Sequence, residues 1–189
     1  MSSASPFLNT MTTTLSFVEL PVGAETLPWL AALWVGVWML RPVATIIHEL
    51  GHALPALAFT KAEVEVRIGE SFTKPLKVLG RFGFALSFRS SFTGFTGYPR
   101  QRLGKTVLSG IILGGPIASG VACGLGVLGT LSATDPIWWR ISAAAFLCAN
   151  GIVFLRSAIP VTLRPTEQFP DGPLSDGLDL WKTLRGTSN

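Results

Sequence analysis

Charged side chains are scarce in this 189-residue chain, where Asp, Glu, Lys and Arg together make up 14% of the residues. An ordinary soluble domain contains about 25% charged residues, whereas 48% of this chain is hydrophobic. The deficit argues against a typical water-exposed surface and indicates that lipid surrounds much of the protein. Six tryptophans and 20 glycines agree with this interpretation, because membrane helices carry Trp at their interfaces and tolerate Gly.

Cysteine is rare as well. The two cysteines, Cys123 and Cys148, both lie in apolar segments. We interpret them as small buried residues and not as part of a disulfide framework. The sequence leaves a single disulfide between them open.

Basic residues are absent from long stretches of the chain and concentrated in one. Nine of the fifteen Lys and Arg residues fall between positions 61 and 105. Such a block is typical of nucleic-acid binding or of the cytoplasmic loops of membrane proteins. Given the apolar composition, we favour the cytoplasmic loop and expect no nucleic-acid partner. The nine residues are Lys61, Arg67, Lys74, Lys77, Arg81, Arg89, Arg100, Arg102 and Lys105.

Three apolar segments, at about 27–59, 106–131 and 137–159, are each long enough to cross a bilayer, since a crossing needs roughly 20 residues. The first contains Arg41-Pro42 and Pro55, and proline kinks or breaks a helix. It is therefore either one kinked helix or two pieces.

Between the first two apolar segments, polar and apolar residues alternate at 63–68 and approximately at 82–89, within a region of about 63–89. Alternation with a period of two predicts strands. We expect a small antiparallel sheet at the membrane surface, followed by a Gly/Phe/Pro loop over 91–102. The predicted fold is a mainly α membrane protein with a three-transmembrane-helix core and this small sheet between the first and second helices.

The predicted organisation is one membrane-embedded domain over 26–181, flanked by tails. Residues 1–25 lack a basic region typical of a signal peptide, and we expect a flexible non-cytoplasmic tail there. Residues 182–189 form a second tail. Three crossings bring the C-terminal stretch to the membrane side where the first segment ends, near the cytoplasmic face.

The only two histidines, His48 and His52, are four residues apart, and Glu49 follows the first. On a helix this spacing places both imidazoles on one face, where they can bind one metal ion. A glutamate between them is positioned to polarise a metal-bound water. The alternative is a buried helix whose histidines only form hydrogen bonds.

A catalytic zinc site usually has three protein ligands, so the third ligand must be Asp, Glu or Cys. Glycine follows Asp171 and Asp176, which permits a close backbone approach beside the metal but is equally typical of simple turns. Either aspartate fits, and the remaining candidates are Asp179 and Glu167.

Two further polar residues lie in the third apolar segment. Asn150 either bonds a neighbouring helix or serves the site, and Arg156 is more typical of a residue that extends toward the membrane interface.

These features together resemble the site-2 protease family of intramembrane zinc metalloproteases. The similarity covers about 29–181 and resides in a few motifs. One position differs, since Ser119 stands where the family often has asparagine, and the spacing from Asn150 to the Asp-Gly pair is longer than in the compact family motif. The matching motifs are the zinc helix at 46–53, the surface strand at 64–69, Gly115-Pro116, and the series Asn150, Pro160, Ser175-Asp176-Gly177.

The resemblance implies a zinc endopeptidase that hydrolyses membrane-protein substrates in or near the bilayer. It implies His48, His52 and Asp176 as Zn²⁺ ligands, with Asp171 the alternative third ligand, and Glu49 and Asn150 as catalytic residues. It also implies a multi-pass protein of a bacterial inner or plasma membrane, whose partners are the lipid bilayer and a substrate helix.

No substrate-recognition module such as a PDZ domain fits between the helices. A minimal core of this kind would act on few substrates or rely on an accessory protein partner. The alternative function is a catalytically silent membrane binding or scaffold protein that retains the fold, against which the intact Glu49 argues. A soluble metalloprotease is disfavoured by the three apolar segments.

Overall fold

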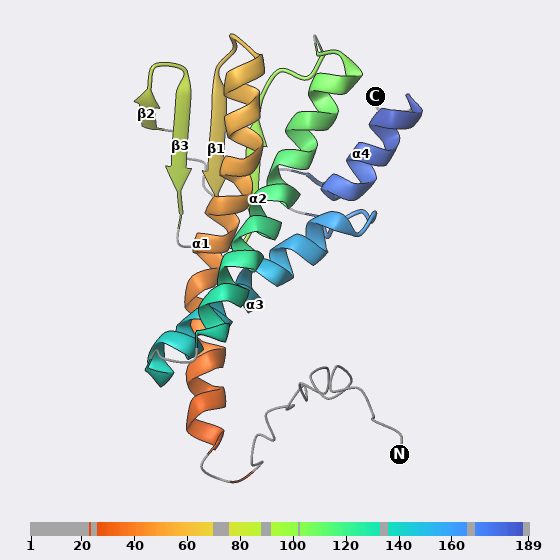
Figure 1. The fold of residues 1–189 in the computed structure, drawn as a ribbon. Helices are drawn as coiled ribbons and strands as arrows, with labels where there is room; N and C mark the ends of the chain where they lie inside the picture. The colour runs from red at the N-terminus through yellow and green to blue at the C-terminus, as the bar shows by residue number, and fades with distance from the viewer. Residues whose placement is uncertain are drawn as a thin grey trace, which may run out of the picture.

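The computed structural model describes residue 23 and residues 26–69, 76–87, 92–101, 103–132, 136–165 and 169–186. The predicted N-terminal tail, apart from residue 23, lies outside these ranges. In the described part, a long helix precedes a sheet, and three helices follow it (Figure 1). In order, the elements are α1 (Leu27–Phe59), β1 (Val64–Ile68), β2 (Leu76–Leu79), β3 (Phe82–Leu86), β4 (Gly94–Gly97), α2 (Lys105–Leu131), α3 (Ile137–Ala158) and α4 (Asp176–Arg185).

Helices α1, α2 and α3 are long and apolar enough to cross a membrane, and their bounds agree with the three predicted segments. Helix α1 is a single helix that continues through Pro42 and Pro55 and runs the length of the molecule (Figure 1), which settles the choice between one piece and two. The outer faces are strongly apolar. Trp34 and Leu128, for example, are 69% and 66% exposed, as expected of surfaces that meet lipid and not water.

Helices α1 and α2 approach each other most closely at Gly51 and Gly114. A Cβ atom built on Gly114 would overlap the Gly51 carbonyl oxygen, and one on Gly51 would overlap the Gly114 carbonyl. Small residues allow this kind of backbone approach between membrane helices. The crossing lies one residue before His52 in α1 and therefore fixes which part of α2 faces the histidines.

The four strands form one sheet with the order β2-β3-β1-β4. The pairs β2–β3 and β1–β4 are antiparallel, but β1 and β3 are parallel, so the prediction of an antiparallel sheet was wrong for the central pair. After β1, the chain leaves the neighbouring strand position empty and forms β2 at the outer edge of the sheet. It then turns back through Gly80. Strand β3 returns into the space between β2 and β1, and this return direction makes it parallel to β1.

Strand β4 lies in the stretch predicted to be a loop, beyond the predicted strand region of 63–89. Its pairing with β1 places it at one edge of the sheet. The sheet packs on the second half of α1 through Val64, Val66 and Ile68, all fully buried against Ala53 and Ala56. This packing holds β4 beside α1.

Helix α4 begins at Asp176 and continues to Arg185, across the predicted boundary between domain and tail. Its start has a standard cap, because the Ser175 hydroxyl accepts a hydrogen bond from the Leu178 amide. Its end is marked by Gly186 in the left-handed conformation, with φ 75°.

We expect Gly114→Ala to destabilise the protein by about 1–3 kcal/mol, because the new methyl group forces α1 and α2 apart. The measurement is the apparent melting temperature in detergent. Gly124→Ala on the same helix is the matched control, since a Cβ at Gly124 meets no atom within 4 Å. Equal melting temperatures for the two variants would show that the close crossing is not needed for stability.

Candidate metal centre

Helix α1 places His48 and His52 on one face, and both are buried, with 6% and 7% exposure. Their Nε2 atoms lie 3.2 Å apart. The rings stand nearly perpendicular, with an interplanar angle of 87°. The spacing of four residues thus produces the convergence that the sequence predicted.

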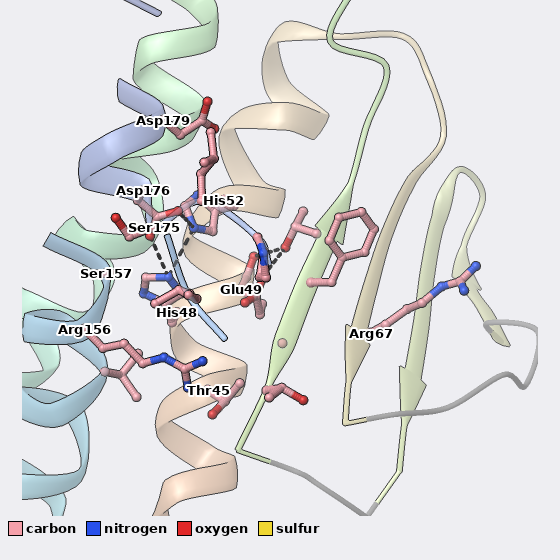
Figure 2. Close-up of a pocket in the computed structure, with 18 of the residues that line it drawn as sticks. Thr45, His48, Glu49, His52, Arg67, Arg156, Ser157, Ser175, Asp176 and Asp179 are labelled. Atoms are coloured by element: carbon pink, nitrogen blue, oxygen red, sulfur yellow. Dashed lines mark hydrogen bonds and ion pairs between the residues drawn. The ribbon is translucent and has the colours of Figure 1, made fainter. Parts of the chain in front are cut away.

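The start of α4 brings Asp176 to the same point (Figure 2). Its Oδ2 lies 3.0 Å from His48 Nε2, and its Oδ1 lies 3.4 Å from His52 Nε2. Two contacts hold the start of α4 in place. The Ser175 hydroxyl donates to the Ile159 carbonyl at 2.6 Å, and a Cβ on Gly177 would overlap the Ala158 carbonyl. The glycine after Asp176 therefore permits close approach to the end of α3.

Helix α2 orients the two imidazoles through their other nitrogens. His52 Nδ1 lies 2.8 Å from the Ile111 carbonyl oxygen, and a carbonyl only accepts, so this nitrogen carries the proton. In the neutral ring, Nε2 then presents its lone pair to the centre. His48 Nδ1 is held by the Ser119 hydroxyl at 3.0 Å. Metal-binding histidines typically have a partner of this kind on the second nitrogen.

Gly115 closes the site on the α2 side. A Cβ at this position would overlap His52 Nε2 and would lie 2.8 Å from His48 Cε1. The space in front of the two Nε2 atoms therefore exists because residue 115 has no side chain. Any larger residue would occupy the place where a ligand of the histidines must sit.

The three side chains fit a metal ion. At tetrahedral angles, metal–ligand bonds of about 2.0 Å place two ligand atoms about 3.3 Å apart, and the observed separations are 3.0, 3.2 and 3.4 Å. Three acceptor groups that face one another also need positive charge between them, from a cation or from protons on the imidazoles. The group of His48, His52 and Asp176 could therefore hold a metal ion.

The electrostatics keep Asp176 ionised. Burial on its own would raise the pKa of this carboxyl. When the imidazoles are protonated and no metal is bound, hydrogen bonds from the two histidines and their positive charge outweigh burial and lower the pKa to about 2. Its place in the first turn of α4 acts in the same direction, because a helix N-terminus favours negative charge.

Glu49 is buried beside the cluster, with 7% exposure, and is not one of its members. Instead, the Thr96 hydroxyl on β4 donates to Glu49 Oε2 at 2.6 Å. The strand lies so close that a Cβ on Gly94 would be 2.5 Å from Glu49 Oε1. One carboxylate is thus available to take a proton next to a site that could hold a metal.

The cluster and Glu49 open into a cavity of about 500 Å³ lined by α1, α3, β4 and the start of α4. The close-up in Figure 2 shows the side chains around it, with β4 on one side of α1 and α4 on the other. The lining of this cavity therefore comes from helices and from the sheet.

The remaining candidates that the structure describes are not members of the cluster. Asp171 is exposed in a turn with Gly172, whose φ is 81°, which is the simple explanation of that Asp-Gly pair. Asp179 forms an ion pair with Arg100 at 2.5 Å, and Glu167 lies outside the described residues. Asn150 is fully buried in α3, does not line the cavity, and donates to the Phe146 carbonyl of its own helix at 2.9 Å.

Sequence reasoning did not assign roles to Ser119 and Thr96. Ser119 was identified only as a departure from a family pattern, and its position four residues after Gly115 could have placed it on the same helix face. Thr96 carries no local signal, because its role depends on the pairing of β4 with β1 far along the chain.

No protein-family model, curated protein or solved structure matches this chain. The resemblance to a family that the motifs indicate therefore stays a prediction from the sequence.

We expect the wild-type protein to bind about one equivalent of metal, and Asp176→Ala to weaken binding. The loss should exceed the roughly 10- to 100-fold that removing a hydrogen-bond partner of a ligand costs. The measurement is metal content by mass spectrometry after dialysis against graded chelator. Asp171→Ala is the control and should retain wild-type metal content. Metal loss in that variant alone would make Asp171 the third ligand.

Proposed function

We propose that this protein is an intramembrane zinc endopeptidase similar to the site-2 proteases. The observation that carries the proposal is the convergence of His48, His52 and Asp176 beside the buried carboxylate of Glu49. This arrangement lies in a cavity between helices long and apolar enough to cross a membrane. The proposed substrate is a membrane-protein segment that enters this cavity.

Zinc is the metal that suits these residues best. Two imidazoles and one carboxylate with a fourth position open are a common ligand set of catalytic zinc. Magnesium and calcium prefer oxygen ligands, and two of the three groups here are nitrogens. Zinc also has no redox chemistry, so the proposed reaction is a hydrolysis.

Zinc held by the three residues would supply a Lewis acid that makes water more acidic and polarises the scissile carbonyl. The work of this chain's own residues begins with Glu49, which takes a proton from the attacking water as the new C–O bond forms. It then gives that proton to the nitrogen as the C–N bond breaks, so that the products are a carboxylic acid and an amine. Thr96 positions the Glu49 carboxylate, and Ile111 and Ser119 fix the imidazoles.

A helical substrate must unwind before its carbonyls can be reached, and β4 provides a surface for the extended form. Gly69 N donates to Thr93 O at 2.7 Å, so alternation along the antiparallel β1–β4 pair directs the Phe95 amide toward β1. The Thr96 amide then points toward the outer edge. Addition of a substrate strand at this edge would bring it past Glu49.

We expect Glu49→Gln to reduce cleavage of a membrane-helix substrate by about 10²–10⁴-fold, because the amide cannot take the proton of water. Metal content should be unchanged, since Glu49 is not in the ligand group. The measurement is product formation in detergent with purified protein. Glu63→Gln is the control, because Glu63 lies outside the cavity and pairs with Lys77. Metal binding without any Glu49-dependent cleavage would favour the silent binding protein.

We expect Thr96→Pro to lower kcat/KM at least about tenfold more than Thr96→Val, with metal content unchanged in both. Both substitutions remove the hydroxyl, but only proline removes the amide that would bond a substrate strand. Proline is tolerated where an edge amide faces outward. Equal activities would exclude strand addition at β4 while leaving the role of Glu49 intact.

A further inference from the structure

Four arginines line the same cavity as the metal cluster. Arg67 and Arg100 form ion pairs with Glu65 and Asp179, and the other two lie on helices. Arg41 belongs to α1 and Arg156 to α3. Figure 2 shows the Arg156 side chain extending from α3 toward α1, on the side of Thr45. Arg41, Thr45, His48 and His52 follow one another at spacings of three and four residues, so they form a single stripe on the cavity face of α1.

Neither arginine has an acidic partner in the described part of the chain, where ion pairs within 4.0 Å involve other residues. The three carboxylates that line the cavity are already engaged. Glu49 is bonded to Thr96, Asp176 faces the two histidines, and Asp179 pairs with Arg100. The positive charge of the two arginines is therefore not neutralised by the cavity itself.

The surroundings of Arg41 add to this imbalance. Its Nε atom is buried and has no hydrogen-bond partner among the described residues. Its guanidinium lies over the Phe92 ring, 5.2 Å from the centroid, and close enough to Arg156 for the two charges to repel each other. An ionisable residue in a membrane-spanning helix is costly and generally faces a partner or a substrate path. Since two such residues face one cavity, we expect an anion to bind between them.

The spacing indicates what that anion belongs to. Arg41 precedes His48 by seven residues, which corresponds to about 10 Å along a helix axis. An extended peptide covers the same distance with about three residues. A peptide whose scissile bond lies at the metal cluster would therefore place its third residue from that bond beside the two guanidinium groups.

We propose that Arg41 and Arg156 form a subsite for a carboxylate of the substrate peptide, about three residues from the bond that is cleaved. The carboxylate is either an Asp or Glu side chain or the C-terminal carboxylate of the peptide. Guanidinium groups match the planar geometry of a carboxylate with paired N–H donors. The subsite rests on the proposed endopeptidase function and gives it a substrate preference.

The decisive test measures binding, so that it does not depend on turnover. Fluorescent apolar peptides are titrated into Glu49→Gln protein in uncharged detergent with zinc present. The peptides carry Asp, Asn or Lys at one internal position and end in a carboxylate or an amide. We expect at least one carboxylate peptide to bind about tenfold more tightly than its uncharged counterpart. Comparison of the internal and terminal positions distinguishes the two sources of the carboxylate.

The preference should disappear when Arg41→Gln and Arg156→Gln are combined in the same background. Arg140→Gln, which removes a charge from α3 outside the cavity, is the matched control and should retain the preference. Since the double variant could fold poorly, Arg156→Glu alone provides a second measurement. It should bind the Lys peptide more tightly than the Asp peptide.

Three results would overturn the subsite. The first is equal affinity for carboxylate and uncharged peptides, the second is no binding of the carboxylate peptides, and the third is a preference that survives removal of both arginines.

Displacement of the carboxylate peptide by phosphatidylglycerol at equimolar amounts, but not by phosphatidylcholine, would assign the arginines to a lipid phosphate instead. Absence of Glu49-dependent cleavage of these peptides by the enzyme with Glu49 intact would reject the proposed function, while the binding results would still decide the subsite.

Discussion

The close crossing of α1 and α2 at Gly51 and Gly114 is the contact on which the rest of the site depends. With no Cβ on either residue, the backbones meet directly, and the stripe of Ile111, Gly115 and Ser119 on α2 lies against the two histidines of α1. That stripe has the same spacing of four residues as the histidines, so one helix pair orients both rings. Moving α2 outward would remove the Ile111 carbonyl and the Ser119 hydroxyl from their imidazoles together.

The other elements are built around this helix pair. The sheet is anchored on α1 by the buried side chains of β1, and β4 reaches Glu49 because it pairs with β1. On the opposite side, the segment after α3 is tied down by Ser175, whose hydroxyl bonds to backbone groups of Ile159 and Val161. Asp176 is the next residue, so the hydrogen bonds of Ser175 to the backbone just after α3 set its position.

The sequence was sufficient for features that depend on local spacing. The bounds of the long helices follow from their apolar length, and the convergence of His48 and His52 follows from helical geometry. Return of the C-terminal segment to the histidines followed from counting three crossings, and the structure confirms it through Asp176. The choice between Asp171 and Asp176 could not be made from local spacing, since both precede glycine; it depends on which aspartate begins a helix packed on the end of α3.

Features that depend on distant pairing were missed or wrong. Strand β4 has the sequence Gly-Phe-Thr-Gly, in which two glycines, a residue type depleted in strands, flank only two strand-forming residues. It exists because β1 offers an edge. The parallel pairing of β1 and β3 results from the placement of β2 at the outer edge, which no local pattern specifies. Helix α4 was overlooked because it is short, although Ser175 and Gly186 mark its ends.

The charges of the cavity are separated along α1, and this separation constrains the orientation of whatever enters. Glu49 and Asp176 lie beside the histidines, whereas Arg41 lies about two helical turns from His48 along α1, with Arg156 near it. A peptide along this face meets hydrogen-bond donors and positive charge at its far end, where an amino terminus or a lysine would be repelled. Repulsion of wrong substrates is one of the two ways in which a site becomes specific. If the proposed endopeptidase function holds, the arginines would thus restrict which peptides enter a site that has no separate recognition module among the described residues.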